Sequence, residues 1–176
     1  MFFTMIIMIV IIQRLVELFV AKRNEKWMLG QGSFEVGAGH YPFMVAMHIA
    51  FFITLIFEFF IMDPPLSPLW ILFLMLFLIA QIARIWCLTS LGKFWNTKIL
   101  ILPGADVVKK GPYQFIRHPN YVIVTTELLV LPLLFSAYFT AIIFSLLNLW
   151  MLSVRIPAEE KALKKATNYK ERFSLK

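Results

Sequence analysis

The residues best suited to chemistry in this chain of 176 residues lie in the stretch GPYQFIRHPNY, residues 111–121. Pro119 favours an extended conformation for the preceding residue and suits the first position of a helix. We therefore expect a helix to begin here, with His118 at its N-terminus. Unpaired backbone N–H groups at a helix start attract anions, and Arg117 adds a forked cation. The stretch predicts a site for a carboxylate or phosphate; the alternative is a helix cap beside a lipid-facing arginine.

A second charged group lies near the C-terminus, in the stretch RIPAEE, residues 155–160. Glu159 and Glu160 would interact favourably with the dipole of a helix that starts here, so a structural role is available to them. However, Arg155 ends an apolar stretch, and the two acids follow just past a proline. Opposite charges are thus gathered at one membrane boundary. Together with residues 111–121, they predict a zwitterionic pocket for a ligand that carries both a carboxylate and an ammonium group.

Two polar residues are expected deeper in the protein, Glu127 and Asn148. At 1.5 Å per helical residue, both should lie on the order of 10 Å inside the same boundary, on the two arms of a hairpin. Polar groups at that depth tend to face the interior of a helix bundle. We predict that they line an acceptor cavity, with Glu127 taking a proton from a hydroxyl acceptor; alternatively, Glu127 pairs with Arg84 and holds two helices together. His40, which ends a glycine-rich loop, is a further candidate for contact with the acceptor.

Long apolar stretches must position these groups. The chain is 60% hydrophobic, with a mean hydropathy of +0.78, which excludes an ordinary soluble domain. Five stretches approach or exceed the roughly 20 residues that cross the hydrocarbon core as a helix. We predict one all-α, polytopic membrane domain. Its five transmembrane helices are expected at residues 2–21, 41–62, 69–90, 120–135 and 137–154.

The distribution of Lys and Arg orients these helices. None of the 17 basic residues falls in a predicted external loop. Because basic residues in short loops stay in the cytoplasm, we expect an external N-terminus, a cytosolic C-terminus and a multi-pass protein of the plasma membrane. Segments 91–119 and 155–176 would then face the cytosol. The net charge of +7 suits contact with the anionic lipids of the inner leaflet. We therefore expect the lipid bilayer, and not nucleic acid, as the partner.

Three further expectations concern local structure and metal binding. Segment 22–40 should be a glycine-rich loop, and residues 97–102 should form an extended run. Pro157 should end the last transmembrane helix and begin an amphipathic helix over residues 157–172, lying at the membrane surface. The three histidines and the single cysteine have no metal-ligand spacing, so no metal is expected.

Two motifs carry a resemblance to a known family: V-x-x-G-P-Y-x-x-x-R-H-P-x-Y, from Val108 to Tyr121, and R-x-x-x-E-E-x-x-L, from Arg155 to Leu163. With Leu91, Gly92 and Trp95 upstream, they resemble the isoprenylcysteine carboxyl methyltransferase family of membrane enzymes. The resemblance covers about the C-terminal half of the chain. It implies an S-adenosylmethionine-dependent O-methyltransferase acting on an apolar acceptor with a carboxylate or acidic hydroxyl, for example an alkylpyrone-type polyketide or a prenylcysteine-like carboxylate.

The resemblance also assigns roles to residues. The expected cofactor-binding residues are Gly111, Tyr113, Arg117, His118, Pro119, Tyr121, Glu159 and Glu160. Arg155 is expected to be catalytic, holding an anionic acceptor oxygen, or else to bind the cofactor carboxylate. From its position in the chain and not from the resemblance, Glu127 is the second expected catalytic residue, and on the same ground Asn148 and His40 are the expected acceptor contacts. Holding an acceptor oxygen in line with the methyl group, away from water, is the main requirement of such a transfer.

The chain departs from the family pattern at two places. Ile123 stands where the family commonly has glycine, and Thr167-Asn168 replaces a phenylalanine-glycine pair. Two other functions remain open at this point. Membrane sterol reductases that use NADPH carry a similar segment, and the charged motifs could serve only as topology signals in a non-catalytic membrane protein.

Overall fold

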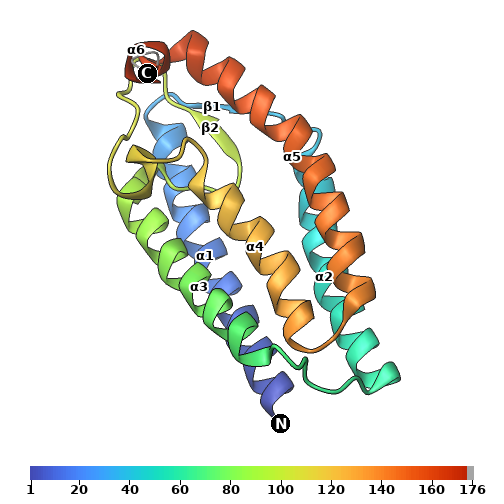
Figure 1. Cartoon of the computed structure of the whole chain (residues 1–176). Helices are drawn as coiled ribbons and strands as arrows, with labels where there is room; N and C mark the ends of the chain where they lie inside the picture. Colours follow the sequence, from blue (N-terminus) through green and yellow to red (C-terminus); the bar gives the residue numbers. More distant parts are fainter. Residues whose placement is uncertain (174–176) are drawn as a thin grey trace. The chain divides into compact units, whose positions relative to one another are not determined.

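The computed structural model describes residues 1–173, and helices dominate this part of the chain (Figure 1). In chain order the elements are α1 (Phe2–Gly30), β1 (Phe34–Val36), α2 (Tyr41–Met62), α3 (Trp70–Leu91), the short 3-10 helix η1 (Gly92–Phe94), β2 (Ile99–Ile101), the 3-10 helix η2 (Gly111–Gln114), α4 (Pro119–Leu134), α5 (Tyr138–Ala166) and α6 (Tyr169–Phe173). The predicted all-α class is confirmed, with one small two-stranded sheet among the described residues.

Four of the described helices are long and apolar enough to cross a membrane: α1, α2, α3 together with η1, and α5. The fifth apolar helix, α4, is shorter. Large apolar side chains such as Phe57, Ile82 and Trp150 are more than half exposed. Such side chains suit a lipid environment and would be costly in water. The prediction of a polytopic membrane protein is confirmed.

The prediction that Pro157 ends a helix is wrong, because α5 runs through it to Ala166. A proline inside a helix removes one backbone hydrogen bond and crowds the preceding turn, at a cost of about 3 kcal/mol. The next nine residues, AEEKALKKA, are strong helix formers, and they continue the helix past this local defect. The expected single helix over residues 157–172 is instead divided at Thr167 and Asn168, with α6 following.

The chain divides into two units. The first contains residues 1–38, 91–108 and, within the described part of the chain, 158–173; the second contains residues 39–90 and 109–157. The boundary at residue 157 falls within α5, so this helix contributes to both units.

In the first unit, α1 extends to Gly30 and β1 follows, so the expectation of a loop over residues 22–40 is wrong for most of that segment. Phe34 pairs with Ile101 in the antiparallel register of β1 and β2, which agrees with the extended run predicted at residues 97–102. The side chain of Asn24 on α1 donates hydrogen bonds to the backbone oxygens of Gly92 and Trp95, at 3.1 and 2.8 Å. These bonds hold the chain that leaves α3 against α1.

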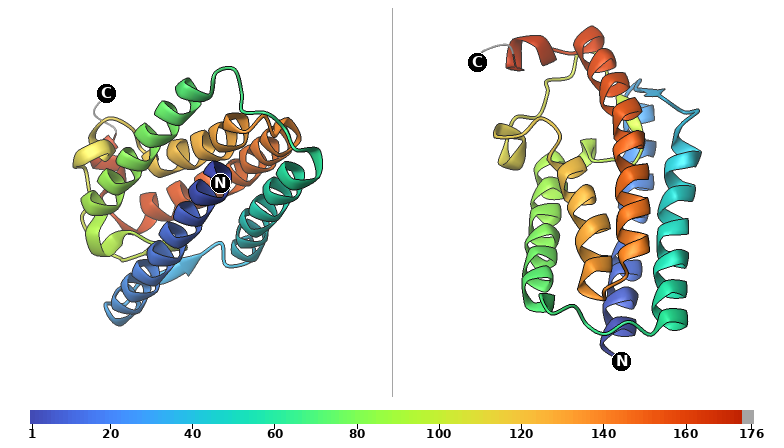
Figure 2. Two further views of the ribbon diagram at one scale, coloured as in Figure 1. Left: turned by 90° about the horizontal axis from the view of Figure 1, so that it is seen from below. Right: turned by 45° about the vertical axis from the view of Figure 1, so that its right-hand side comes forward.

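In the second unit, α2 and α5 lie side by side and antiparallel, as the views in Figures 1 and 2 agree. The rings of Phe51 and Phe144 meet edge to face, with centroids 5.5 Å apart. The turn between α4 and α5 is tight, and Ser136 within it has a φ of 54°. This turn joins the two arms of the hairpin that was expected to carry Glu127 and Asn148.

Candidate active site

The Gly-Pro-Tyr turn that opens the 111–121 stretch packs against α3. Gly111 has a φ of 58°, and a Cβ atom there would lie 2.0 Å from Oγ of Ser90 and 3.0 Å from Nε1 of Trp86. Only glycine satisfies both the left-handed backbone and this close approach. Tyr113 is buried and hydrogen-bonds the thiol of Cys87. The turn is therefore fixed to α3 before the chain enters α4.

His118 is the N-cap residue of α4, and Pro119 occupies the first turn, as predicted. The side chain of His118 makes no capping hydrogen bond. Its ring instead stacks on that of Tyr121, with centroids 5.5 Å apart and an interplanar angle of 25°. Arg117 is exposed beside it. The first turn of α4 thus presents backbone N–H groups, an imidazole and a guanidinium at one place, an arrangement that favours an anion.

Sequence reasoning missed Asn120, which lies between His118 and Tyr121 in the chain. Its Oδ1 atom is buried and has no hydrogen-bond partner among residues 1–173. A buried polar atom without a partner costs free energy, so a donor supplied by a ligand or by water would stabilise it. The only signal in the sequence was an amide side chain inside the motif.

Arg155 and Asn148 lie on the buried face of α5 and are only 4% and 2% exposed. The amide of Asn148 donates to Oγ1 of Thr125 at 2.9 Å, and this hydroxyl in turn donates to the backbone oxygen of Tyr121. The contact joins α5 to the first turns of α4. Asn148 therefore has an interhelical role in addition to any contact with an acceptor.

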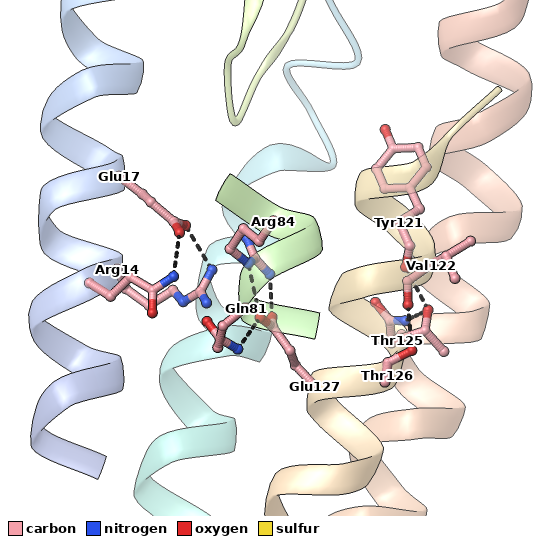
Figure 3. Close-up of polar contacts among 11 residues, drawn as sticks. Arg14, Glu17, Gln81, Arg84, Tyr121, Val122, Thr125, Thr126 and Glu127 are labelled. Atoms are coloured by element: carbon pink, nitrogen blue, oxygen red, sulfur yellow. Dashed lines mark hydrogen bonds and ion pairs between the residues drawn. The ribbon is translucent and has the colours of Figure 1, made fainter. Parts of the chain in front are cut away.

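Glu127 is engaged by α3 in the way that the alternative interpretation expected (Figure 3). Its carboxylate forms an ion pair with Arg84, with Arg84 Nε 2.9 Å from Oε1, and it accepts a further hydrogen bond from Gln81 at 2.7 Å. This arrangement joins α3 to α4.

Glu159 and Glu160 belong to the first unit, whereas the residues of the 111–121 stretch belong to the second. Oε1 of Glu160 accepts a hydrogen bond from the hydroxyl of Tyr169 at 3.2 Å, and Oε2 pairs with Lys164 at 2.7 Å. Both oxygens of Glu160 are thus used within their own unit. A single pocket shared by the two motifs stays a prediction.

His40 is the N-cap residue of α2, and both of its ring nitrogens are shielded from solvent without a hydrogen-bond partner in the described part of the chain. The pKa of His40 is lowered from its ordinary value, first by burial and then by the charge of Arg155. His48 lies eight residues further along the chain, on α2. Unlike His40, it has a nearby polar partner, because its Nδ1 lies 2.8 Å from the backbone oxygen of Met44. The two histidines therefore have different environments on one helix.

The family model for the isoprenylcysteine carboxyl methyltransferase (ICMT) family matches residues 72–165, which is more than half of the chain. The chain belongs to the isoprenylcysteine carboxyl methyltransferase family. The matched range includes both motifs that carried the resemblance, which is confirmed. Membership of the ICMT family indicates a membrane methyltransferase in general terms.

Two curated relatives match most of this ICMT family member. The uncharacterized protein YpbQ of Bacillus subtilis is 48% identical over 161 residues, which cover 92% of this chain and 96% of the relative. An uncharacterized protein of Haemophilus influenzae is 27% identical over 151 residues, covering 85% of this chain and 88% of the relative. No solved structure matches.

The two departures from the ICMT family pattern have distinct structural settings. Ile123 is 6% exposed on α4, so its side chain fills interior space that a glycine would leave open. Thr167 caps the end of α5 through its hydroxyl, which donates to the backbone oxygen of Leu163 at 2.7 Å. Asn168 accepts a hydrogen bond from the backbone N–H of Val107 at 2.9 Å and bonds the carboxylate of Asp106. Thr167 and Asn168 thus tie the end of α5 to the segment after β2.

Proposed function

We propose that this protein is an S-adenosylmethionine-dependent O-methyltransferase of the plasma membrane. Its acceptor would be an apolar, lipid-like molecule with a carboxylate or acidic hydroxyl, such as an alkylpyrone-type polyketide or a prenylcysteine-like carboxylate. The observation that supports this most strongly is the start of α4, where His118 stacks on Tyr121 beside Arg117 within the range matched by the family model.

The residues present fit a zwitterionic cofactor. The start of α4, with Arg117 and His118, suits the carboxylate of the amino acid part of the cofactor. The buried Oδ1 of Asn120 could accept a hydrogen bond from a ligand donor. Gly111, Tyr113 and Pro119 position this turn through their packing on α3 and at the start of α4. When bound, S-adenosylmethionine supplies an electrophilic methyl group on a sulfonium.

Glu159 and Glu160 enter the proposal through the second family motif. Glu159 is the first candidate for the ammonium group and Glu160 the second; Oε1 of Glu160 accepts a hydrogen bond from Tyr169, and its Oε2 pairs with Lys164. The proposed role of Glu159 depends on the motif alone.

On the acceptor side, the proposal assigns the central role to Arg155. A buried guanidinium keeps its charge, so Arg155 suits an ionised acceptor oxygen. Asn148 and His40 are the further acceptor contacts in this proposal. Glu127 becomes a structural residue in place of a base, because its carboxylate already accepts hydrogen bonds from Arg84 and Gln81.

Orientation also belongs to the proposal. The basic residues of the chain would place the C-terminus, the start of α4 and the end of α5 on the cytosolic side. S-adenosylmethionine from the cytosol would then meet an acceptor that is dissolved in the lipid bilayer.

Equilibrium binding to the purified protein in lipid nanodiscs tests this function. We expect S-adenosylhomocysteine to bind and NADPH not to bind. The variant His118→Ala should weaken the affinity for S-adenosylhomocysteine at least tenfold, whereas the control His48→Ala should leave it unchanged. Binding of NADPH instead of S-adenosylhomocysteine would contradict the proposal and favour a reductase. Transfer of a labelled methyl group to a lipid extract would then test the reaction itself.

A further inference from the structure

The buried faces of α2 and α5 form two matching stripes within the second unit. On α2 the buried residues are Met47, Phe51, Leu55 and Glu58; on the part of α5 in this unit they are Thr140, Ala141, Phe144, Asn148, Met151 and Arg155. Apart from the adjacent pair Thr140 and Ala141, their spacing of three and four residues is that of one helix face. Phe51 contacts Phe144 at the middle of the two stripes, and polar residues lie at the ends.

At one end, the polar groups satisfy one another completely. The carboxylate of Glu58 is 7% exposed and accepts hydrogen bonds from the backbone N–H groups of Phe139 and Thr140, at 3.0 and 2.8 Å. It also accepts one from the hydroxyl of Thr140 at 2.5 Å. Glu58 thus caps the start of α5, and both oxygens of this carboxylate have hydrogen-bond donors from the protein itself.

The other end brings His40 and Arg155 to the same level. Counting eleven residues back from Phe51 reaches His40, and eleven residues forward from Phe144 reaches Arg155. Eleven residues make about three helical turns, so each residue returns to the same face as its phenylalanine. In agreement with this placement, the positive charge of Arg155 helps to lower the pKa of His40.

This end differs from the Glu58 end because His40 lacks partners. Neither ring nitrogen has a hydrogen-bond partner within residues 1–173, although both are shielded from solvent. A neutral imidazole still carries one N–H donor. An unsatisfied buried donor is costly, so this end of the stripes is built for a partner that the protein does not supply.

We propose that His40 donates its ring N–H to an acceptor oxygen that is already ionised when it binds beside Arg155, and that this pair selects acidic acceptors over ordinary alcohols and phenols. This inference rests on the proposed function for the methyl donor. His40 is then a specificity-determining residue and not a general base.

A base role fits the surroundings of His40 poorly. Burial and the neighbouring guanidinium both oppose a positive charge on the ring, so taking up an acceptor proton there is unfavourable. An acceptor that arrives ionised avoids this step. Its oxygen forms a bond to the methyl carbon, the carbon–sulfur bond breaks, and the electron pair stays on sulfur as a neutral thioether. No proton has to move.

The test uses the full-length protein in nanodiscs with saturating S-adenosylhomocysteine, which cannot transfer a methyl group. The probes are a labelled alkyl hydroxypyrone, an acidic enol, and an alkylphenol of the same chain length, with a phenol pKa of about 10. Empty nanodiscs give the partition background. We expect the wild-type protein to bind the hydroxypyrone at neutral pH at least tenfold more tightly than the alkylphenol.

Three variants separate the roles of His40. His40→Ala should weaken hydroxypyrone binding about tenfold, the loss expected for a hydrogen bond to a charged group. His40→Gln keeps an N–H donor but cannot act as a base, and it should retain most of the affinity and of the turnover. The control His48→Ala should change neither. S-adenosylhomocysteine affinity should stay at the wild-type value in all three.

Equal hydroxypyrone affinity in His40→Ala and the wild type would overturn the inference, as would equal binding of the two probes or no binding of the hydroxypyrone above background. A His40→Gln variant that binds normally but does not turn over would show a base instead. Failure of the proposed function gives a different result: S-adenosylhomocysteine would not bind, while the acidic probe would still depend on His40.

Discussion

The guanidinium of Arg84 on α3 and the carboxylate of Glu127 on α4 form a buried ion pair, with Arg84 Nε 2.9 Å from Oε1 of Glu127. Arg84 is 4% exposed and Glu127 is 9% exposed. Removing one partner of such a pair leaves an uncompensated charge, which typically costs about 3–5 kcal/mol. Variants of this pair can therefore show whether Glu127 has a structural or a catalytic role.

We expect Glu127→Gln to lower thermal stability strongly while the turnover of the folded fraction stays near the wild-type value. The double variant Arg84→Met with Glu127→Leu should recover most of the stability, because apolar replacements of a buried pair are often neutral. Thermal unfolding in detergent and single-turnover methyl transfer measure the two effects. A stable Glu127→Gln variant with little turnover would instead indicate a proton-accepting role.

Gly111 offers a test of how the motif is positioned. We predict that Gly111→Ala destabilises the protein by about 1–3 kcal/mol through overpacking, with a further cost of about 1–2 kcal/mol for the left-handed backbone. It should also weaken binding of S-adenosylhomocysteine, because the turn that carries His118 shifts away from α3.

The nearest obstacle to that added methyl group is Oγ of Ser90, at 2.0 Å. Combining Gly111→Ala with Ser90→Ala should therefore recover part of the lost stability, whereas Ser90→Ala alone serves as the control. Full stability of Gly111→Ala by itself would show that the turn is not packed against α3 as described.

Asn168 stands where the family pattern has glycine, and we expect Asn168→Ala to lower stability by about 1 kcal/mol, the usual net value of a hydrogen bond. The variant loses the bond to the backbone N–H of Val107 and the contact with Asp106. Asn168→Asp separates these contacts, because its carboxylate still accepts from Val107 but repels Asp106. Thermal unfolding curves of the two variants should both lie below that of the wild type; unchanged curves would assign the Asn168 contacts no role in stability.

The contacts of the Lys98 ammonium group with two carboxylates predict that the protein loses stability at high pH. The pKa of Lys98 is raised from its ordinary value of 10.5, chiefly by hydrogen bonds to Glu25 and Glu35, at 2.7 and 3.1 Å. A raised pKa in the folded state means that this contribution to stability is fully present below pH 10.5 and is lost as the pH rises through the folded pKa.

The difference in melting temperature between the wild type and Lys98→Met should therefore be largest near neutral pH and should shrink above about pH 11. Circular dichroism melts at several pH values measure it. A difference that stays constant through this range would mean that the charge of Lys98 does not hold α1, β1 and the start of β2 together.

The sequence predicted the helices well because their signal is local. A run of apolar residues such as 41–62 needs no partner to identify it, and α2 has those bounds. The start of α4 was also predictable, since Pro119 acts on its immediate neighbours and His118 is the N-cap residue. Predictions that depended on competing local effects were weaker: the run of helix formers after Pro157 outweighed the proline.

Most partners of the polar residues were beyond the reach of the sequence, which offered the pair of Glu127 and Arg84 only as one of two alternatives. Nothing near Glu58 in the sequence indicates its role, because its partners on α5 are 81 and 82 residues away. Asn120 and His40 are ordinary polar residues in the sequence, and only the surrounding helices show that they are shielded and lack partners.

The sequence by itself determined the membrane-spanning helices, the family and the motifs, because apolar length, charge placement and residue spacing are properties of the chain itself. Only the tertiary structure decided which polar groups are satisfied. It assigned Glu127 to Arg84 and Glu160 to Tyr169, and it left His40 without a protein partner beside Arg155. The physical reason is that the cost of a buried polar group depends on the atoms around it, and packing between helices brings those atoms from distant parts of the chain.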